Sequence, residues 1–147
     1  MNKINTWEEF HQDILELKNK FGEYRPDIIV PCMLGGLIPG AIIAKQMKIN
    51  DVRPIDIERI GDQRRISYDI IGDIKGKKVL IIEDDITTGK GPFMVRKVFQ
   101  EREAEVKLAS VYVIPETKDG LDYYSKVYEK IPNYPWKDFH SGDKLRN

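Results

Sequence analysis

The sequence predicts an α/β fold, a mainly parallel central sheet flanked by helices. Helical and strand patterns alternate along the chain, as they do in folds of this class. Two apolar runs, residues 79–82 and 108–114, are continuous rather than alternating, which is typical of strands buried on both faces of a parallel sheet. With 147 residues, no internal repeat and no Ser/Gly linker, residues 1–147 are expected to form a single domain.

The first third of the chain is expected to supply two helices with a strand between them. Thr6 and Glu9 have the spacing of a capping box, and apolar residues then recur at steps of three and four from position 7 to position 21. A short apolar strand is expected at residues 28–31. A glycine pair ends it, and residues 37–47 are expected to be helical.

The remainder of the chain is expected to contain further strands and one more helix. Ile55 and Ile57 alternate with acidic residues, which predicts a half-exposed strand. A charged segment around a glycine separates this strand from a return strand expected at residues 66–71. Pro92 lies where a helix is expected to begin, and the aromatic, proline-containing chain from residue 132 is expected to be a loop.

The charge balance limits the partners of this protein. There are 24 lysines and arginines against 24 aspartates and glutamates, so the formal net charge is zero. This balance argues against a protein that coats nucleic acid or an anionic membrane by bulk electrostatics, and we expect neither partner. It remains compatible with a local pocket for a polyanion.

The single cysteine and the longest apolar stretch have simple structural interpretations. Cys32 has no partner for an internal disulfide and lies in an apolar run, so it is expected to be a small buried hydrophobe. The stretch over residues 28–44 contains two prolines and three glycines, which favours strand, turn and buried helix over a membrane span. The first ten residues lack the apolar core of a signal peptide, so a cytoplasmic protein is expected.

The segment over residues 79–92 carries the chemistry. A buried strand brings Glu83, Asp84 and Asp85 to its carboxyl end, which is where open α/β sheets bind ligands. The loop that follows leads into a helix, so its backbone amides and the helix dipole suit a phosphate. The carboxylates suit vicinal hydroxyls or a divalent cation, and the combination describes a ribose 5-phosphate. The loop consists of Thr87, Thr88, Gly89, Lys90 and Gly91.

Other phosphate and acid motifs do not have this spacing. A P-loop requires glycine where Asp84 stands and Ser or Thr where Gly91 stands. The glycines of residues 35–40 do not follow the dinucleotide-binding pattern. A phosphoacceptor pocket would use the acids but leaves the Thr-Thr-Gly-Lys-Gly loop unexplained. An acidic loop without a ligand is the remaining alternative.

Residues 79–91 resemble the phosphoribosyl diphosphate (PRPP) binding motif of the type I phosphoribosyltransferases. The shared features are four apolar residues, an acidic pair, two further positions and Thr-Thr-Gly. The resemblance implies that Glu83 and Asp84 bind the ribose hydroxyls and act indirectly on the Mg²⁺ of PRPP. It also implies that residues 87–91 wrap the 5-phosphate, and it makes Glu83, Asp84 and Thr87 the catalytic candidates. Asp85 replaces a usually apolar residue, and Gly91 replaces Ser or Thr.

The resemblance extends to the small bacterial xanthine-guanine and hypoxanthine phosphoribosyltransferases. Residues 35–40, Gly-Gly-Leu-Ile-Pro-Gly, reproduce a pattern of that group, and Tyr134-Pro135-Trp136 is similar to its Pro-Trp ending. The resemblance implies a mobile hood at about residues 57–72 and a base-side region at about residues 115–147. It further implies a diphosphate site made by Leu34, Gly35, Gly36, Arg59 and Arg64.

Four residues depart from this group at positions that contact substrate. Leu34 stands where a cation precedes the paired glycines, and Ile114 stands where a lysine contacts the purine 6-oxo group. Ile131 replaces an aromatic that stacks on the base, and Thr87 replaces an aspartate that contacts the purine ring. Base-binding roles are therefore expected at Ile114, Ile131 and Trp136, but the base is not defined.

The function implied is that of a nucleobase phosphoribosyltransferase in nucleotide salvage. Such an enzyme transfers ribose 5-phosphate from PRPP to a purine-like base with Mg²⁺ as cofactor, and it releases diphosphate. PRPP and a nucleobase are the expected partners, and a homodimer or larger assembly is expected. One alternative is a catalytically weak or inactive regulatory protein that binds PRPP or a nucleotide. Another is transfer to an unusual base that suits an apolar pocket.

Overall fold

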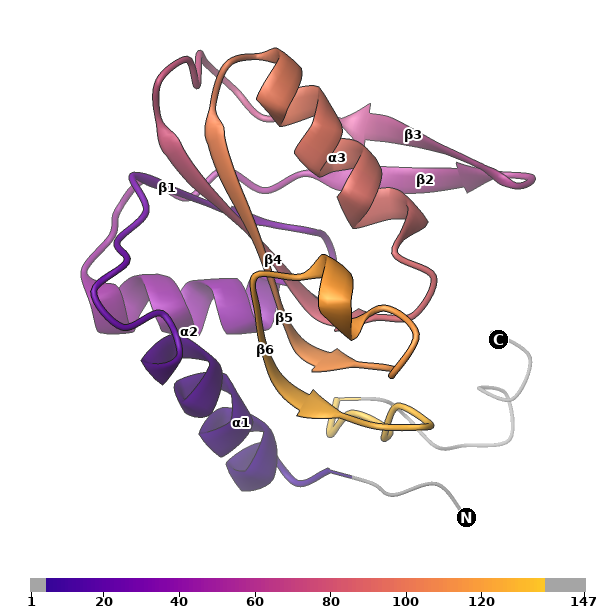
Figure 1. Ribbon diagram of the computed structural model, residues 1–147. Coiled ribbons are helices and arrows are strands. Elements are labelled where there is room, and N and C mark those ends of the chain that lie inside the picture. Colours follow the sequence, from indigo (N-terminus) through magenta and orange to yellow (C-terminus); the bar gives the residue numbers. More distant parts are fainter. Residues whose placement is uncertain (1–4, 137–147) are drawn as a thin grey trace.

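The computed structural model describes residues 5–136, which form a parallel sheet between layers of helices and a separate hairpin (Figure 1). The sheet has four strands in the order β1, β4, β5, β6, and all three pairings are parallel. This arrangement confirms the predicted fold class. The strands are β1 (Ile28–Pro31), β4 (Lys78–Ile86), β5 (Glu105–Val113) and β6 (Tyr123–Val127).

Helices cover both faces of the sheet. Helices α1 and α2 lie on one face and helix α3 lies on the other (Figure 1). The predicted capping box is present, since the Thr6 side chain accepts from the amide of Glu9 and the Glu9 side chain accepts from the amide of Thr6. The helices are α1 (Trp7–Asn19), α2 (Leu37–Met47) and α3 (Lys90–Glu101), and a short 3₁₀ helix η1 (Lys118–Gly120) follows β5.

Strand β4 is the central element of the site and of the core. Leu80 and Ile82 belong to the buried cluster on the side of α1 and α2, whereas Val79 and Ile81 belong to the cluster on the side of α3. This alternation follows from the two-residue period of a strand. All four side chains have no exposed surface, so the strand is buried on both faces as the continuous apolar run predicts.

The charged middle segment forms an antiparallel hairpin. Strands β2 (Asp56–Ile60) and β3 (Gln63–Tyr68) meet at a turn in which Gly61 has a positive φ of 59°. Ile57 and Ile66 face each other across the hairpin and pack against the α3 side of the core. The return strand predicted at residues 66–71 is therefore misplaced, because it begins three residues earlier and ends at Tyr68.

Other elements also differ from the sequence prediction, since β4 and β5 both begin before the predicted runs at residues 79–82 and 108–114. Helix α3 begins at Lys90, before Pro92, because Gly89 adopts a left-handed conformation (φ 75°) that turns the chain into the helix. Strand β6 was not predicted, since its short sequence, Tyr-Tyr-Ser-Lys-Val, has only partial burial and no clear alternation. It owes its place to parallel pairing with β5.

Within residues 5–136, no helix is long and apolar enough to cross a membrane. The apolar stretch of residues 28–44 instead forms β1, a turn and most of α2, as predicted. Residues 137–147, which belong to the predicted base-side region, lie outside the described residues.

Candidate active site

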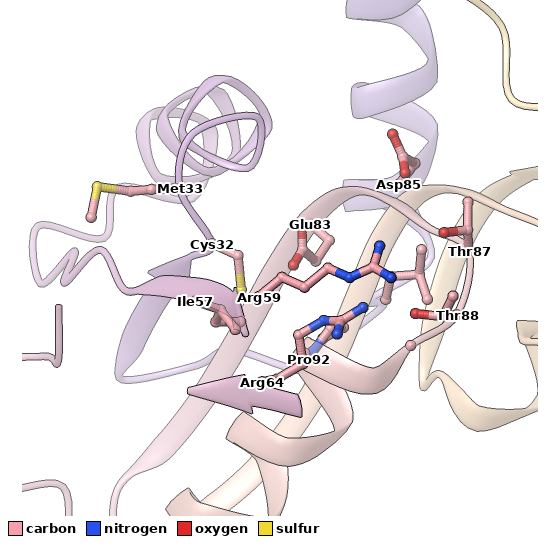
Figure 2. A pocket seen from close by; sticks show the side chains of 13 residues that line it. Cys32, Met33, Ile57, Arg59, Arg64, Glu83, Asp85, Thr87, Thr88 and Pro92 are labelled. Atoms are coloured by element: carbon pink, nitrogen blue, oxygen red, sulfur yellow. The ribbon is translucent and has the colours of Figure 1, made fainter. Parts of the chain in front are cut away.

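A pocket of about 200 Å³ opens at the carboxyl end of β4. It is bounded by the end of β4, by the loop that leads into α3, by the β2–β3 hairpin and by Cys32 and Met33, which follow β1. Figure 2 shows the carboxylate of Glu83 facing the sulfur of Cys32 on one side of this pocket. Segments distant in the sequence thus meet where the parallel sheet ends, as expected for a ligand site in this fold class.

The three acids at the end of β4 have different environments. Glu83 and Asp85 line the pocket. Asp84 lies against the turn after β1, because a Cβ built on Gly35 would come within 1.9 Å of its Oδ2 atom. Asp85 accepts a hydrogen bond of 2.5 Å from the hydroxyl of Tyr134. Of the predicted acidic pair, Glu83 therefore lines the pocket, whereas Asp84 lies against the turn of residues 33–36.

Burial is the main influence on the ionisation of Glu83. It raises the pKa of the Glu83 carboxyl well above its usual range, and the negative charges of Asp84 and Asp85 raise it further. A hydrogen bond from the Cys32 thiol acts in the opposite direction. The pKa of that thiol is itself raised, first by burial and then by Glu83. Cys32 is 2% exposed, which confirms the prediction that it is buried. Its contact with Glu83 was not predicted from the sequence.

The loop before α3 forms the wall opposite the hairpin. Thr87, Thr88, Gly89 and Gly91 line the pocket, whereas Lys90 does not and its side chain is exposed. The amides of the first turn of a helix have no partners within the helix and lie at the positive end of its dipole. Thr88 Oγ1 accepts from the amide of Lys90 at 3.4 Å. The Thr87 hydroxyl and the later amides of this turn lie at the same wall, as a phosphate requires.

Two arginines reach the pocket from the hairpin. Arg59 and Arg64 are direct partners in the β2–β3 pairing, so both side chains project from one face of the hairpin. Figure 2 shows their guanidinium groups extending toward the loop that carries Thr87 and Thr88. Arg65 projects from the opposite face, where it pairs with Glu58.

The two pocket arginines are held by their own turn. Arg59 Nε donates to the carbonyl of Gly61 at 2.9 Å, and Arg64 Nη1 donates to the carbonyl of Gln63 at 3.2 Å. Among the ion pairs of the described residues, none involves either guanidinium group. Their positive charge therefore faces the pocket.

The predicted diphosphate turn is tightly packed. A Cβ on Gly36 would lie 2.5 Å from the carbonyl oxygens of both Cys32 and Ile82, so only glycine has room there. The amide of Gly36 donates to the carbonyl of Cys32 at 2.9 Å. Leu34 is 78% exposed. None of residues 34–36 lines the 200 Å³ pocket, and their role toward diphosphate remains a prediction.

The predicted base-side residues lie beyond that pocket. Ile114 is half-buried directly after β5, and Ile131 and Trp136 pack against the α1 side of the core. Trp136 stacks on Tyr134 with ring centroids 4.4 Å apart. Tyr134 was not selected from the sequence, although it precedes the Pro-Trp pair. The signal that could have identified it is the unusual acid at position 85, which it contacts.

The described residues contain no cluster of three or more His, Cys, Asp or Glu side chains arranged to hold a metal ion. Magnesium usually binds proteins through one or two carboxylates together with substrate phosphates and water. Glu83 and Asp84, at the end of β4, are carboxylates of the kind and number that such binding uses. The donor set therefore suits a magnesium ion that arrives with a phosphorylated substrate.

The fold and this site define a phosphoribosyltransferase. Residues 2–145 match the family model of the phosphoribosyl transferase domain, so the chain belongs to that family. Its relatives carry the names of enzymes of this class, as the sequence resemblance implies, and the chain is an enzyme of the same class.

Curated relatives and solved structures agree on this family. The chain is 30% identical over 123 residues to a xanthine-guanine phosphoribosyltransferase of Nitratidesulfovibrio vulgaris, covering 81% of this chain and 73% of that protein. It is 27% identical over 121 residues to the enzyme of the same name from Chromohalobacter salexigens, with 81% and 72% covered. A purine phosphoribosyltransferase structure from Pyrococcus horikoshii matches with a TM-score of 0.87 and 33% identity, covering 95% of this chain and 97% of that one.

The raised pKa of Glu83 predicts a stability that depends on pH. The folded state retains a proton that the unfolded state releases, so the free energy of unfolding falls as pH rises above the ordinary glutamate range. Glu83→Gln removes this penalty and is expected to be more stable than the wild type near pH 8, with a smaller difference near pH 4. Urea unfolding at both pH values measures the effect. The exposed Glu116→Gln is the control, and a Glu83→Gln advantage that is no larger at high pH would contradict the prediction.

Proposed function

We propose that this chain transfers the 5-phosphoribosyl group of PRPP to a purine-like base and releases diphosphate. The observation that carries the proposal is that one pocket joins an acid of β4 to the Thr-Thr-Gly loop at the start of α3. Similarity to proteins named purine and xanthine-guanine phosphoribosyltransferases supports the purine-like base.

The sugar and its phosphate are assigned to the end of β4 and the following loop. The carboxylates of Glu83 and Asp84 would accept hydrogen bonds from the ribose hydroxyls. The hydroxyls of Thr87 and Thr88, with the amides at the start of α3, would hold the 5-phosphate. The buried thiol of Cys32 donates to the Glu83 carboxyl at one side of the pocket.

The reaction is a displacement at C1 of the ribose. A ring nitrogen of the base forms a bond to C1 while the bond from C1 to the diphosphate oxygen breaks, and its electron pair leaves with diphosphate. The proton of the attacking nitrogen passes to solvent. Magnesium bound to PRPP would neutralise the leaving diphosphate. The protein contributes by positioning the sugar and by placing charge beside the leaving group.

The hairpin arginines are assigned to the diphosphate. Leu34 offers no charge where related enzymes carry a cation, whereas Arg59 and Arg64 line the pocket. Guanidinium groups bind phosphate oxygens through two parallel hydrogen bonds, which suits a diphosphate better than a single point charge does. We therefore place the leaving-group charge on the hairpin.

The proposed reaction is tested by incubating the protein with Mg²⁺-PRPP and single bases, and by measuring diphosphate release. The panel contains adenine, guanine, hypoxanthine, xanthine, uracil and orotate. We expect turnover with at least one purine, because Glu83 and the Thr-Thr-Gly loop that the proposal assigns to the sugar phosphate line one pocket. PRPP binding without release in the presence of any base would contradict the proposal and favour the regulatory alternative.

The acids of β4 are tested by PRPP binding. Glu83→Ala combined with Asp84→Ala is expected to weaken PRPP binding at least about a hundredfold, because two carboxyl groups that bind the ribose hydroxyls are lost. Isothermal titration with Mg²⁺-PRPP measures the change, and the exposed Asp119→Ala is the control. Undiminished binding by the double variant would remove the basis of the assignment.

The hairpin arginines are tested by steady-state kinetics. Arg59→Ala and Arg64→Ala are each expected to lower kcat/KM for PRPP about tenfold, because each removes a charged hydrogen-bond donor to diphosphate. Arg65→Ala is the matched control, since Arg65 lies in the same hairpin but faces Glu58 on its other side. Equal losses in all three variants would indicate a general effect of hairpin charge and contradict the assignment.

A further inference from the structure

The carboxyl end of β4 is joined to the last described segment of the chain by one hydrogen bond. Tyr134 donates its hydroxyl proton to Oδ2 of Asp85 at 2.5 Å, although the two residues are 49 positions apart in the sequence. Tyr134 is only 3% exposed, whereas Asp85 is half-buried and lines the pocket. The contact therefore connects the core around Tyr134 to the wall of the candidate active site.

Aromatic contacts pack the segment of residues 133–136 against the core. Tyr134 stacks on Trp136 with ring centroids 4.4 Å apart, and both rings meet Phe10 of α1 edge-to-face at 5.6 and 5.0 Å. The amide of Asn5 donates to the carbonyl of Asn133 at 3.0 Å, which ties the segment to the start of the chain. These contacts hold it against α1, and the Tyr134 hydroxyl connects it to the end of β4.

The hydrogen bond gives a structural reason for both Asp85 and Tyr134. An acid at position 85 is unusual for the PRPP motif, where an apolar residue is typical, and no step of the proposed reaction requires it. A buried tyrosine hydroxyl needs a hydrogen-bond partner, and an apolar residue at position 85 would not supply the carboxylate that Tyr134 contacts here. The hydrogen bond from Tyr134 therefore gives Asp85 a structural partner at a position where an apolar residue is typical.

We propose that the Asp85–Tyr134 hydrogen bond positions residues 131–136 as the base-side wall of the active site. The proposal rests on the proposed function, which assigns base contacts to Ile131 and Trp136. Because these two residues flank Tyr134, the hydrogen bond sets the distance between their segment and the acids of β4. Tyr134 is then a positioning residue for the base, and Asp85 is its anchor.

The test compares Tyr134→Phe with Tyr112→Phe, a matched control. Tyr112 is also fully buried in the same core cluster, its ring lies 5.9 Å from that of Tyr134, and its hydroxyl accepts from Asn5 and donates to Asp13. Tyr112→Phe thus removes a neighbouring buried hydroxyl and leaves the Tyr134–Asp85 contact in place. Steady-state kinetics use PRPP and the purine that the unaltered chain turns over fastest. We expect Tyr134→Phe to raise KM for the base about tenfold, the size of one hydrogen bond to a charged group, and to leave KM for PRPP within about twofold. Tyr112→Phe is expected to leave both constants within about twofold.

A double-variant comparison separates positioning from folding. Asp85→Leu with Tyr134→Phe removes both polar partners, so it is expected to unfold at no lower urea concentration than Tyr134→Phe and to raise KM for the base no further. An unchanged base KM in Tyr134→Phe, or an equal rise in Tyr112→Phe, would overturn the positioning role. Absence of turnover by the unaltered chain would count against the proposed function instead.

Discussion

Burying carboxylates at the end of a central strand is the constraint on which the site depends. Strand β4 lies between β1 and β5, and its residues 79–82 are buried in the apolar core. Glu83 and Asp85 follow directly and line the pocket. Burial penalises the charged form, as the raised pKa of Glu83 records. Hydrogen bonds from neighbouring donors offset part of this cost, because the Cys32 thiol donates to Glu83 and the Tyr134 hydroxyl donates to Asp85.

The zero net charge of the chain conceals a separation of charge across the pocket. The acids lie on the sheet, whereas Arg59 and Arg64 lie on a separate hairpin and hydrogen-bond to their own turn. Because Glu83 and Asp85 form no ion pair with these arginines among the described residues, a ligand can bind between the acids and the arginines and interact with both. A molecule with hydroxyls at one end and phosphates at the other has that complementarity, since carboxylates accept from hydroxyls and guanidinium groups donate to phosphates.

The sequence predicts the parts of this molecule that are set locally. The periodicity of α1, the bounds of α2 and the buried run of β4 depend on near neighbours in the chain, and so does the acid–loop motif. The pairing of Arg59 with Arg64 and the contact between Asp85 and Tyr134 depend on register and long-range packing, which no local pattern encodes. Strand β6 is missed for the same reason, because its partner β5 determines its conformation.

The proposed diphosphate site places its positive charge on the β2–β3 hairpin rather than at position 34, where the residue is leucine. Residue 34 is 78% exposed, so a cation there would interact with diphosphate largely through water, where opposite charges attract weakly. Arg59 and Arg64 line the pocket itself, and each guanidinium group can bind phosphate oxygens through two parallel hydrogen bonds. If the hairpin carries this charge as proposed, diphosphate binding depends on where the hairpin lies. Under this assignment the hairpin that borders the pocket, rather than the turn after β1, supplies the charge that the leaving group needs.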